Sequence, residues 1–176
     1  MPDANAPRIA HPPREAVASG IPPVTGGRVL PILQHPDPTL RQVSRGLPPD
    51  PARLARDMLA TMYAAPGRGL AAIQIGQPWR MFVIDPFWKE GGAAPLIALD
   101  PEIIDPSPEC VTMTESCLSI PDHPVEVTRP ARVTLRWTDL EGRRREARLD
   151  GIAAVCAQHE FDHLDGVLIL DHGSAD

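Results

Sequence analysis

The sequence predicts an α+β fold, because two helical patterns are separated by a run of short β-rich segments. The first helix is expected over residues 51–65 and the second over residues 151–165. Between them, apolar and polar residues alternate through 133–149, as they do in a solvated β-hairpin. Strands and helices do not alternate regularly along the chain, so a parallel α/β sheet is not expected.

Length and composition indicate one globular domain with a hydrophobic core. The chain has 176 residues, of which 43% are apolar and 23% are charged. A net charge of −6 and a pI near 5.5 argue against a nucleic acid, an anionic membrane or an acidic substrate as the partner. No stretch resembles a membrane span or a secretory signal, so we expect a cytoplasmic protein without sequence-specific nucleic-acid binding or a membrane partner.

The first 27 residues are rich in Pro, Ala and Gly and have no apolar period, which predicts a disordered arm over 1–27 and a single domain over 28–176. A transit peptide is the alternative, and the acidic Asp3 and Glu15 disfavour it. The apolar stretch 29–33 then predicts a short strand.

The helix at 51–65 is predicted from its start signals and its apolar stripe. Asp50 can cap it, and Pro51 suits the first helical position because that position needs no N–H donor. The residues expected to be buried share one face, and they are Leu54, Met58, Leu59 and Met62.

The segment 67–76 differs from its surroundings because Gly67 and Gly69 stand among small apolar residues and Gln74 is a lone amide. Glycine allows a backbone to approach a ligand closely. A phosphate-binding loop is excluded, since no Gly-Lys-Ser/Thr follows. A purely structural turn remains the alternative.

Short strands are expected at 81–85 and 96–99, where β-rich runs end at Pro86 and Pro101. The hairpin at 133–149 should turn at 139–142. The basic run 143–145 is more simply an exposed strand edge than a nucleic-acid site, given the acidic chain.

The second helix carries a His-Glu-x-x-His pattern that predicts a metal site. His159 and His163, four residues apart, lie on one face of a helix, so both imidazoles can bind one ion. Glu160 is offset from them, which suits a carboxylate that takes a proton from the attacking water. Asp150 can cap this helix and Gly166 can end it. The alternative is a chance pattern with two packed histidines.

A third ligand is sought among three cysteines, whose odd number makes a disulfide framework improbable. Cys156 shares the histidine face but lies too far along the axis from His163 to reach a shared ion. Cys110 has no comparable context. Cys117, on a separate segment that ends at Pro121, is our candidate, and its thiolate suits zinc or iron.

Three blocks of this sequence, 67–74, 115–119 and 158–163, resemble the three signature motifs of the peptide deformylase family in order and approximate spacing. The segment 35–41 resembles the turn near the start of that family, and the likeness covers roughly 28–171. It implies short antiparallel sheets around a central helix that carries the histidines. It also implies removal of the N-formyl group from N-formylmethionine of nascent polypeptides, with formate released.

The resemblance also implies a role for each site residue. The expected metal ligands are Cys117, His159 and His163. Glu160 corresponds to the general acid/base, and Gln74 together with the backbone N–H of Leu118 corresponds to the donors that stabilise the oxyanion. One divalent metal ion per chain is implied, with Fe²⁺ expected and Zn²⁺, Ni²⁺ or Co²⁺ able to occupy the same site.

Two residues depart from the family pattern at the substrate groove, whose expected lining is Gly67, Arg68, Gly69, Ser116, Val155 and Cys156. Arg68 stands where the family has an apolar residue, and Ser116 where it has glycine. A guanidinium can pair with a carboxylate, so we expect weaker use of ordinary formyl-Met peptides. We also expect tolerance of small formylated or acylated amines, or of substrates with an acidic group near the scissile amide. The alternative is that both substitutions are neutral.

The expected partners are formylated nascent peptides. The chain ends soon after Asp171 without the long C-terminal helix of many bacterial members, which weakens the expectation of ribosome docking. Two rival functions stay open: a non-catalytic or altered-specificity deformylase-like protein, and a metallopeptidase. The second is disfavoured because no further ligand motif follows His163.

Overall fold

A computed structural model of the chain describes residues 8–9 and 26–173 and contains two α-helices, four short 3-10 helices and eight strands in that part. The α-helices are α1 (Pro51–Ala64) and α2 (Gly151–Leu164). The 3-10 helices are η1 (Pro38–Arg41), η2 (Ala72–Ile75), η3 (Trp88–Glu90) and η4 (Ile169–Asp171). The strands are β1 (Arg8–Ile9), β2 (Gly69–Ala71), β3 (Met81–Ile84), β4 (Leu96–Ile104), β5 (Cys110–Cys117), β6 (Ile120–Pro130), β7 (Arg132–Thr138) and β8 (Arg144–Asp150).

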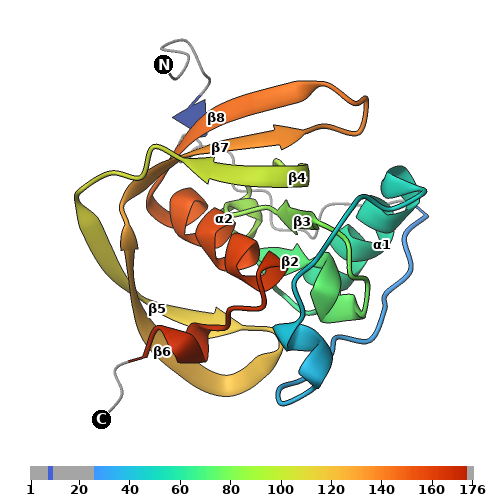
Figure 1. Cartoon of the computed structure of the whole chain (residues 1–176), viewed down its shortest axis with the longest axis horizontal. Helices are drawn as coiled ribbons and strands as arrows, with labels where there is room; N and C mark the ends of the chain where they lie inside the picture. Colours follow the sequence, from blue (N-terminus) through green and yellow to red (C-terminus); the bar gives the residue numbers. More distant parts are fainter. Residues whose placement is uncertain (1–7, 10–25, 174–176) are drawn as a thin grey trace.

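Helix α2 lies at the centre, between two sheets (Figure 1). The larger sheet has the strand order β1-β8-β7-β4-β3-β2, and only its β1–β8 pair is parallel. The smaller sheet is the antiparallel hairpin β5-β6. Helix α1 contacts β2 and β3. The predicted α+β class, with antiparallel sheets around a central helix, is confirmed. In the described part of the chain, neither α-helix has the length and apolar character needed to cross a membrane.

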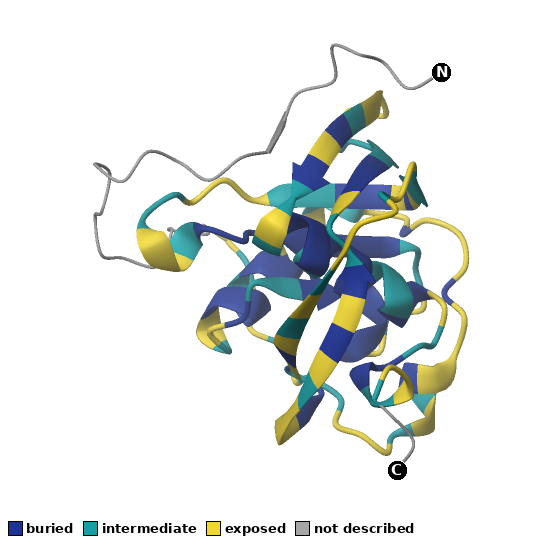
Figure 2. Ribbon diagram, turned by 90° about the vertical axis from the view of Figure 1, so that its left-hand side faces the viewer, coloured by how far each residue is buried: buried dark blue, intermediate teal, exposed yellow. Residues whose placement is uncertain are grey.

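The main core lies between α2 and the larger sheet. Buried and exposed residues alternate along several strands (Figure 2), because neighbouring side chains of a strand point to opposite faces. Small residues of α2, among them Ala153 and Ala157, pack against Phe82 and Leu135 of the sheet. Their size lets the helix approach closely, and the histidines of α2 are thereby held inside the molecule.

Helix α1 forms as its start signals predict. The Asp50 carboxylate accepts a hydrogen bond from the Arg53 N–H at 3.0 Å. Met58, Leu59 and Met62 are buried, and Leu54 packs against the same cluster. The predicted end at residue 65 is one residue beyond the observed end.

The predicted strand at 29–33 is wrong. The Leu30 N–H donates to Thr61 Oγ1 at 2.9 Å, and the Leu33 N–H donates to the Gln74 carbonyl at 2.7 Å. Pro31 has no N–H to donate. The segment therefore bonds to a helix and a 3-10 turn instead of a strand edge.

Strand β4 is longer than the predicted 96–99, because Pro101 does not end it. The register of the β4–β7 pair shifts between Leu99 and Glu102, and Asp100 has a φ of 45°. A bulge of this kind takes up a residue that cannot join the ladder. The predicted strand at 81–85 and the hairpin at 133–149 are confirmed within one residue at each end.

Most of the predicted arm, residues 1–27, lies outside the described residues. Within it, Arg8–Ile9 form β1, which pairs with Arg148 and Leu149 of β8. For the rest of 1–27, the disordered arm stays a prediction.

Candidate metal centre

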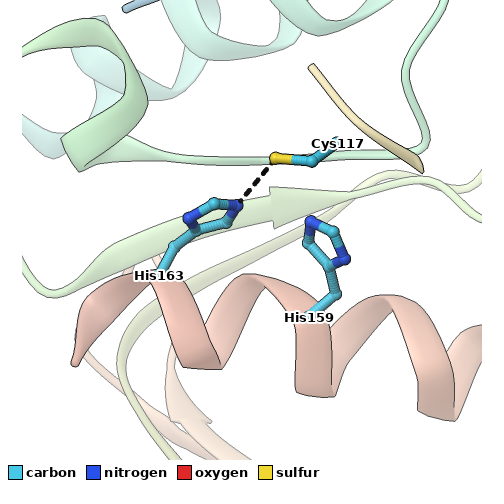
Figure 3. A group of neighbouring side chains, drawn as sticks. All are labelled: Cys117, His159 and His163. Atoms are coloured by element: carbon cyan, nitrogen blue, oxygen red, sulfur yellow. Dashed lines mark hydrogen bonds between the residues drawn. The ribbon is translucent and has the colours of Figure 1, made fainter. Parts of the chain in front are cut away.

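Three ligand side chains meet between α2 and the end of β5. Cys117 closes β5, and His159 and His163 extend from one face of α2 towards it (Figure 3). One ligand atom from each residue lies within 4.8 Å of the others. The Cys117 Sγ is 3.3 Å from His163 Nε2, and the two imidazole centroids are 5.1 Å apart. The geometry brings together the three residues that the sequence singled out.

The residues present fit a divalent metal ion. A sulfur and a nitrogen bound to one tetrahedral metal lie roughly 3.6 Å apart, which matches the Cys117–His163 separation. Burial lowers the pKa of His163 well below its ordinary value, and this favours the neutral imidazole that binds metals. One thiolate with two imidazoles leaves a fourth tetrahedral position, as catalytic sites require.

His159 is oriented by a buried carboxylate. Its Nδ1 lies 2.8 Å from Glu115 Oε2, so Nε2 faces the centre. Arg129 donates to both oxygens of Glu115, at 2.6 and 3.0 Å. Burial acts to raise the pKa of Glu115, but the bonds from His159 and Arg129 outweigh it and hold the pKa at about 2. Glu115 is therefore ionised and fixes both the ring and its tautomer.

The network continues outward from Arg129. Its guanidinium also donates to Asp162 at 2.8 Å, and Asp162 lies 2.7 Å from His172 Nε2. These contacts tie β5 and β6 to α2 and to the segment after it.

Glu160 lies beside the three ligands and is not one of them. It is buried, and its Oε2 has no hydrogen-bond partner among the described residues. Burial raises the pKa of this carboxyl to about 7. A Cβ on Gly69 would overlap Glu160 Oε1, which explains the glycine at that position. The glycines of 67–76 were expected to let the backbone approach a ligand, and at Gly69 the backbone approaches the Glu160 side chain.

The Gln74 amide points at the centre in a fixed orientation. Its Oε1 accepts from the Ala71 N–H at 2.9 Å. Its Nε2 donates to Ser119 Oγ at 3.1 Å and lies 3.7 Å from Cys117 Sγ. The lone amide is therefore buried with its N–H groups on the side of the metal ligands.

Helix α2 ends as predicted, but its start is not capped in the predicted way. Asp150 occupies the N-cap position, but its side chain makes no capping bond. Gly166, with a φ of 73°, follows the last turn, and its N–H donates to the His163 carbonyl at 3.2 Å. Glycine is suited to that left-handed conformation.

A cleft of about 330 Å³ opens beside the three ligands. All of the predicted site residues except His163 line it, and His163 is buried behind it. Cys156 lines the cleft and lies outside the cluster of Cys117, His159 and His163. Cys110 is exposed and also lies outside that cluster.

Arg68 is engaged within the chain. Its guanidinium donates to both oxygens of Glu90, at 2.7 and 2.9 Å, and to the carbonyl of Pro86. The expectation that Arg68 offers a free guanidinium to a substrate is corrected, because Glu90 already supplies the carboxylate. Ser116 is exposed at the rim of the cleft.

The sequence did not single out Glu115 and Arg129 as supports of the centre. Glu115 precedes Cys117 by two residues, so a strand period would have placed both side chains on one face. Arg129 carries no such signal. It reaches Glu115 only because β6 pairs with β5.

Comparison with known proteins identifies the family of this chain. The family model described as "Polypeptide deformylase" matches residues 29–176. The peptide deformylase of Mesorhizobium japonicum is 48% identical over 147 residues, which cover 82% of this chain and 84% of that protein. The peptide deformylase of Agrobacterium fabrum is also 48% identical, over 82% of this chain and 86% of its own.

Solved structures show the same fold. The peptide deformylase of Thermotoga maritima superposes with a TM-score of 0.76 at 37% identity and covers 84% of this chain and 99% of its own. The class I type b peptide deformylase of Acinetobacter baumannii was solved bound to Met-Ala-Ser. It has a TM-score of 0.75 at 29% identity, and the match covers 82% of this chain and 98% of that chain. From this match over most of its length, the chain belongs to the peptide deformylase family.

Proposed function

We propose that this protein removes the N-formyl group from N-formylmethionine at the start of nascent polypeptides and releases formate. The observation that carries the proposal is the convergence of Cys117, His159 and His163 beside the buried Glu160, in a chain of this family. The Acinetobacter baumannii relative binds Met-Ala-Ser, which is the chain that remains when a formyl group leaves formyl-Met-Ala-Ser.

Cys117, His159 and His163 would hold one divalent ion, and we propose Fe²⁺ as that ion. Zn²⁺, Ni²⁺ and Co²⁺ accept the same thiolate and imidazole ligands. When bound, such an ion supplies Lewis-acid chemistry, which makes water a nucleophile near neutral pH.

Glu160 moves the proton in the proposed reaction. Its carboxylate takes a proton from the attacking water and later delivers it to the leaving amine. A pKa of about 7 suits both tasks, because the group gains and loses a proton readily at neutral pH. Burial beside Gly69 keeps competing hydrogen-bond partners away from its Oε2.

The Gln74 amide and the Leu118 backbone N–H stabilise the negative charge that develops on the formyl oxygen. The Ala71 N–H holds Gln74 Oε1, so the Nε2 hydrogens stay on the side of the centre. A donor held in place before the reaction needs no rearrangement when charge develops, and such a donor is worth about 3 kcal/mol.

Formylated nascent chains emerge from ribosomes in the cytoplasm, so we place the protein there. Weak association with the ribosome is part of the same proposal and is measured by co-sedimentation.

The function is tested by loading the protein with Fe²⁺ under anaerobic conditions and measuring formate release from formyl-Met-Ala-Ser. Release that depends on the metal supports the proposal. Tight peptide binding without formate would instead identify a non-catalytic relative. Cleavage of a peptide bond would identify a metallopeptidase.

A further inference from the structure

The short turn η3 is fastened to the rim of the cleft at two points. Trp88 Nε1 donates to the Gly67 carbonyl at 2.7 Å. Glu90 accepts two hydrogen bonds from Arg68, and Arg68 also donates to the Pro86 carbonyl. The residue between these two anchors is therefore held at a fixed place beside the segment 67–69.

That residue is Lys89, which lines the cleft and is exposed. Its ammonium lies 5.6 Å from the centre of the Trp88 ring, within range of a cation–π contact. It makes no ion pair with a carboxylate in the part of the chain that the structure describes. Lys89 is the only lysine of the sequence.

The other charged groups around the cleft have partners of opposite charge or belong to the reaction. The charge of Arg68 is offset by Glu90, and that of Glu115 by Arg129. Glu160 carries the proton in the proposed reaction. Among the described residues that line the cleft, Lys89 thus carries a positive charge that no ion pair offsets, although the whole chain carries −6.

We propose that Lys89 selects formylated peptides that carry a carboxylate beyond the formyl-bearing residue. This inference rests on the proposed deformylase function. Arg68 has a positioning role. Its two hydrogen bonds to Glu90 occupy that carboxylate, which therefore forms no ion pair with Lys89, and they hold η3 at the rim. The carboxylate comes from an acidic side chain or from the C-terminus of a short peptide, since both present the same group.

Kinetics on matched peptides measures this selection. The pair formyl-Met-Glu-Ser and formyl-Met-Gln-Ser, both with amidated C-termini, differs in one charge at nearly equal size. Formyl-Met-Ala-Ser, as the free acid and as the amide, tests the terminal carboxylate separately. We expect the parent to show a kcat/KM about two- to fivefold higher for the carboxylate in at least one pair, as for a solvent-exposed ion pair. The preference should fade in about 0.5 M salt.

Variants assign the preference to one side chain. Lys89→Met removes the charge and keeps the length, so the preference should disappear. Lys89→Arg keeps the charge and should retain it. Arg53→Met removes an exposed cation from α1, outside the cleft lining, and should leave the preference unchanged. Equal kcat/KM within both pairs in the parent, or a preference that survives Lys89→Met, would overturn the inference.

A binding measurement keeps this result separate from the proposed function. The deformylated peptides Met-Glu-Ser and Met-Gln-Ser, as amides, need no turnover to report on Lys89. Amine-selective acylation labels Lys89 and the amino terminus, and digestion followed by mass spectrometry resolves the two. We expect Met-Glu-Ser amide to protect Lys89 about two- to fivefold better than Met-Gln-Ser amide. Equal protection would refute the role of Lys89 even in a protein that releases formate, and unequal protection would support it even if no formate were released.

Discussion

Glu115 and His159 share a hydrogen bond of 2.8 Å that joins β5 to α2 behind the candidate metal centre. Glu115 is two residues before Cys117, so one strand supplies a ligand and the group that orients a second ligand. Arg129 keeps the carboxylate ionised and in place. The centre is therefore built from two segments that must pack together before the ligands meet.

Glu115→Gln should weaken metal affinity by about 10- to 100-fold, because the bond that fixes the ring and tautomer of His159 is changed. Competition with a chromogenic chelator measures the Kd for Zn²⁺ or Co²⁺. Glu109→Gln is the matched control, since Glu109 forms an exposed ion pair with Arg132 at 2.5 Å. Equal affinities in the parent and Glu115→Gln would show that His159 needs no such support.

Cys117→Ala should bind little metal, because the thiolate is one of three ligands that the chain supplies. Cys156→Ala removes a thiol that lines the same cleft outside the cluster, and its metal content should match that of the parent. Elemental analysis of the purified variants compares them. The reverse result, with metal lost only from Cys156→Ala, would identify the other cysteine as the ligand.

Glu160→Gln should retain metal and lose turnover by several orders of magnitude, since the amide cannot accept the proton of the attacking water. The two side chains have nearly the same size, so the packing against Gly69 is preserved. Metal content and kcat on formyl-Met-Ala-Ser are measured on the same preparation. Activity within a few fold of the parent would remove Glu160 from the mechanism.

Gln74→Ala should lower kcat by roughly 100-fold or more, because one donor to the developing oxyanion is lost. Metal affinity should change little, since Gln74 Nε2 is 3.7 Å from Cys117 Sγ and is not a ligand. Separate measurement of kcat and KM distinguishes stabilisation of the transition state from binding of the substrate. A change confined to KM would mean that Gln74 only binds the substrate.

The stability of the protein should fall in acid partly through Asp57. Burial acts to raise the pKa of this carboxyl, but hydrogen bonds from the Arg28 N–H and guanidinium lower it below its ordinary value of 3.8. A pKa that is lower in the folded state gives stability above pH 3.8, and this stability is lost as the pH falls through the folded pKa. The unfolding free energies of the parent and of Asp57→Asn, measured in urea, should therefore converge as the pH falls below about 4. A constant difference over that range would exclude this contribution.

Short-range features of the sequence determined the helices and the choice of candidate metal ligands. Asp50, followed by proline and an apolar stripe, was enough to place α1, because a helix is stabilised by contacts three and four residues apart. His159 and His163 needed only the helical period to share one face. Cys117 and Gln74 were identified from their local blocks, since the family pattern is itself local in sequence.

Only the tertiary structure decided which side chains meet across elements. Arg129 lies opposite Val111 in the β5–β6 pair, and its contact with Glu115 depends on a register that the sequence does not state. Segment 29–33 has the composition of a strand, yet its hydrogen bonds go to α1 and η2 because those elements lie beside it. Arg68 meets Glu90, and Lys89 lines the cleft without an ion pair to any described carboxylate, because η3 folds back onto the rim of the cleft. Contacts between residues far apart in the chain form only when the packed fold brings them together, so no local pattern encodes them.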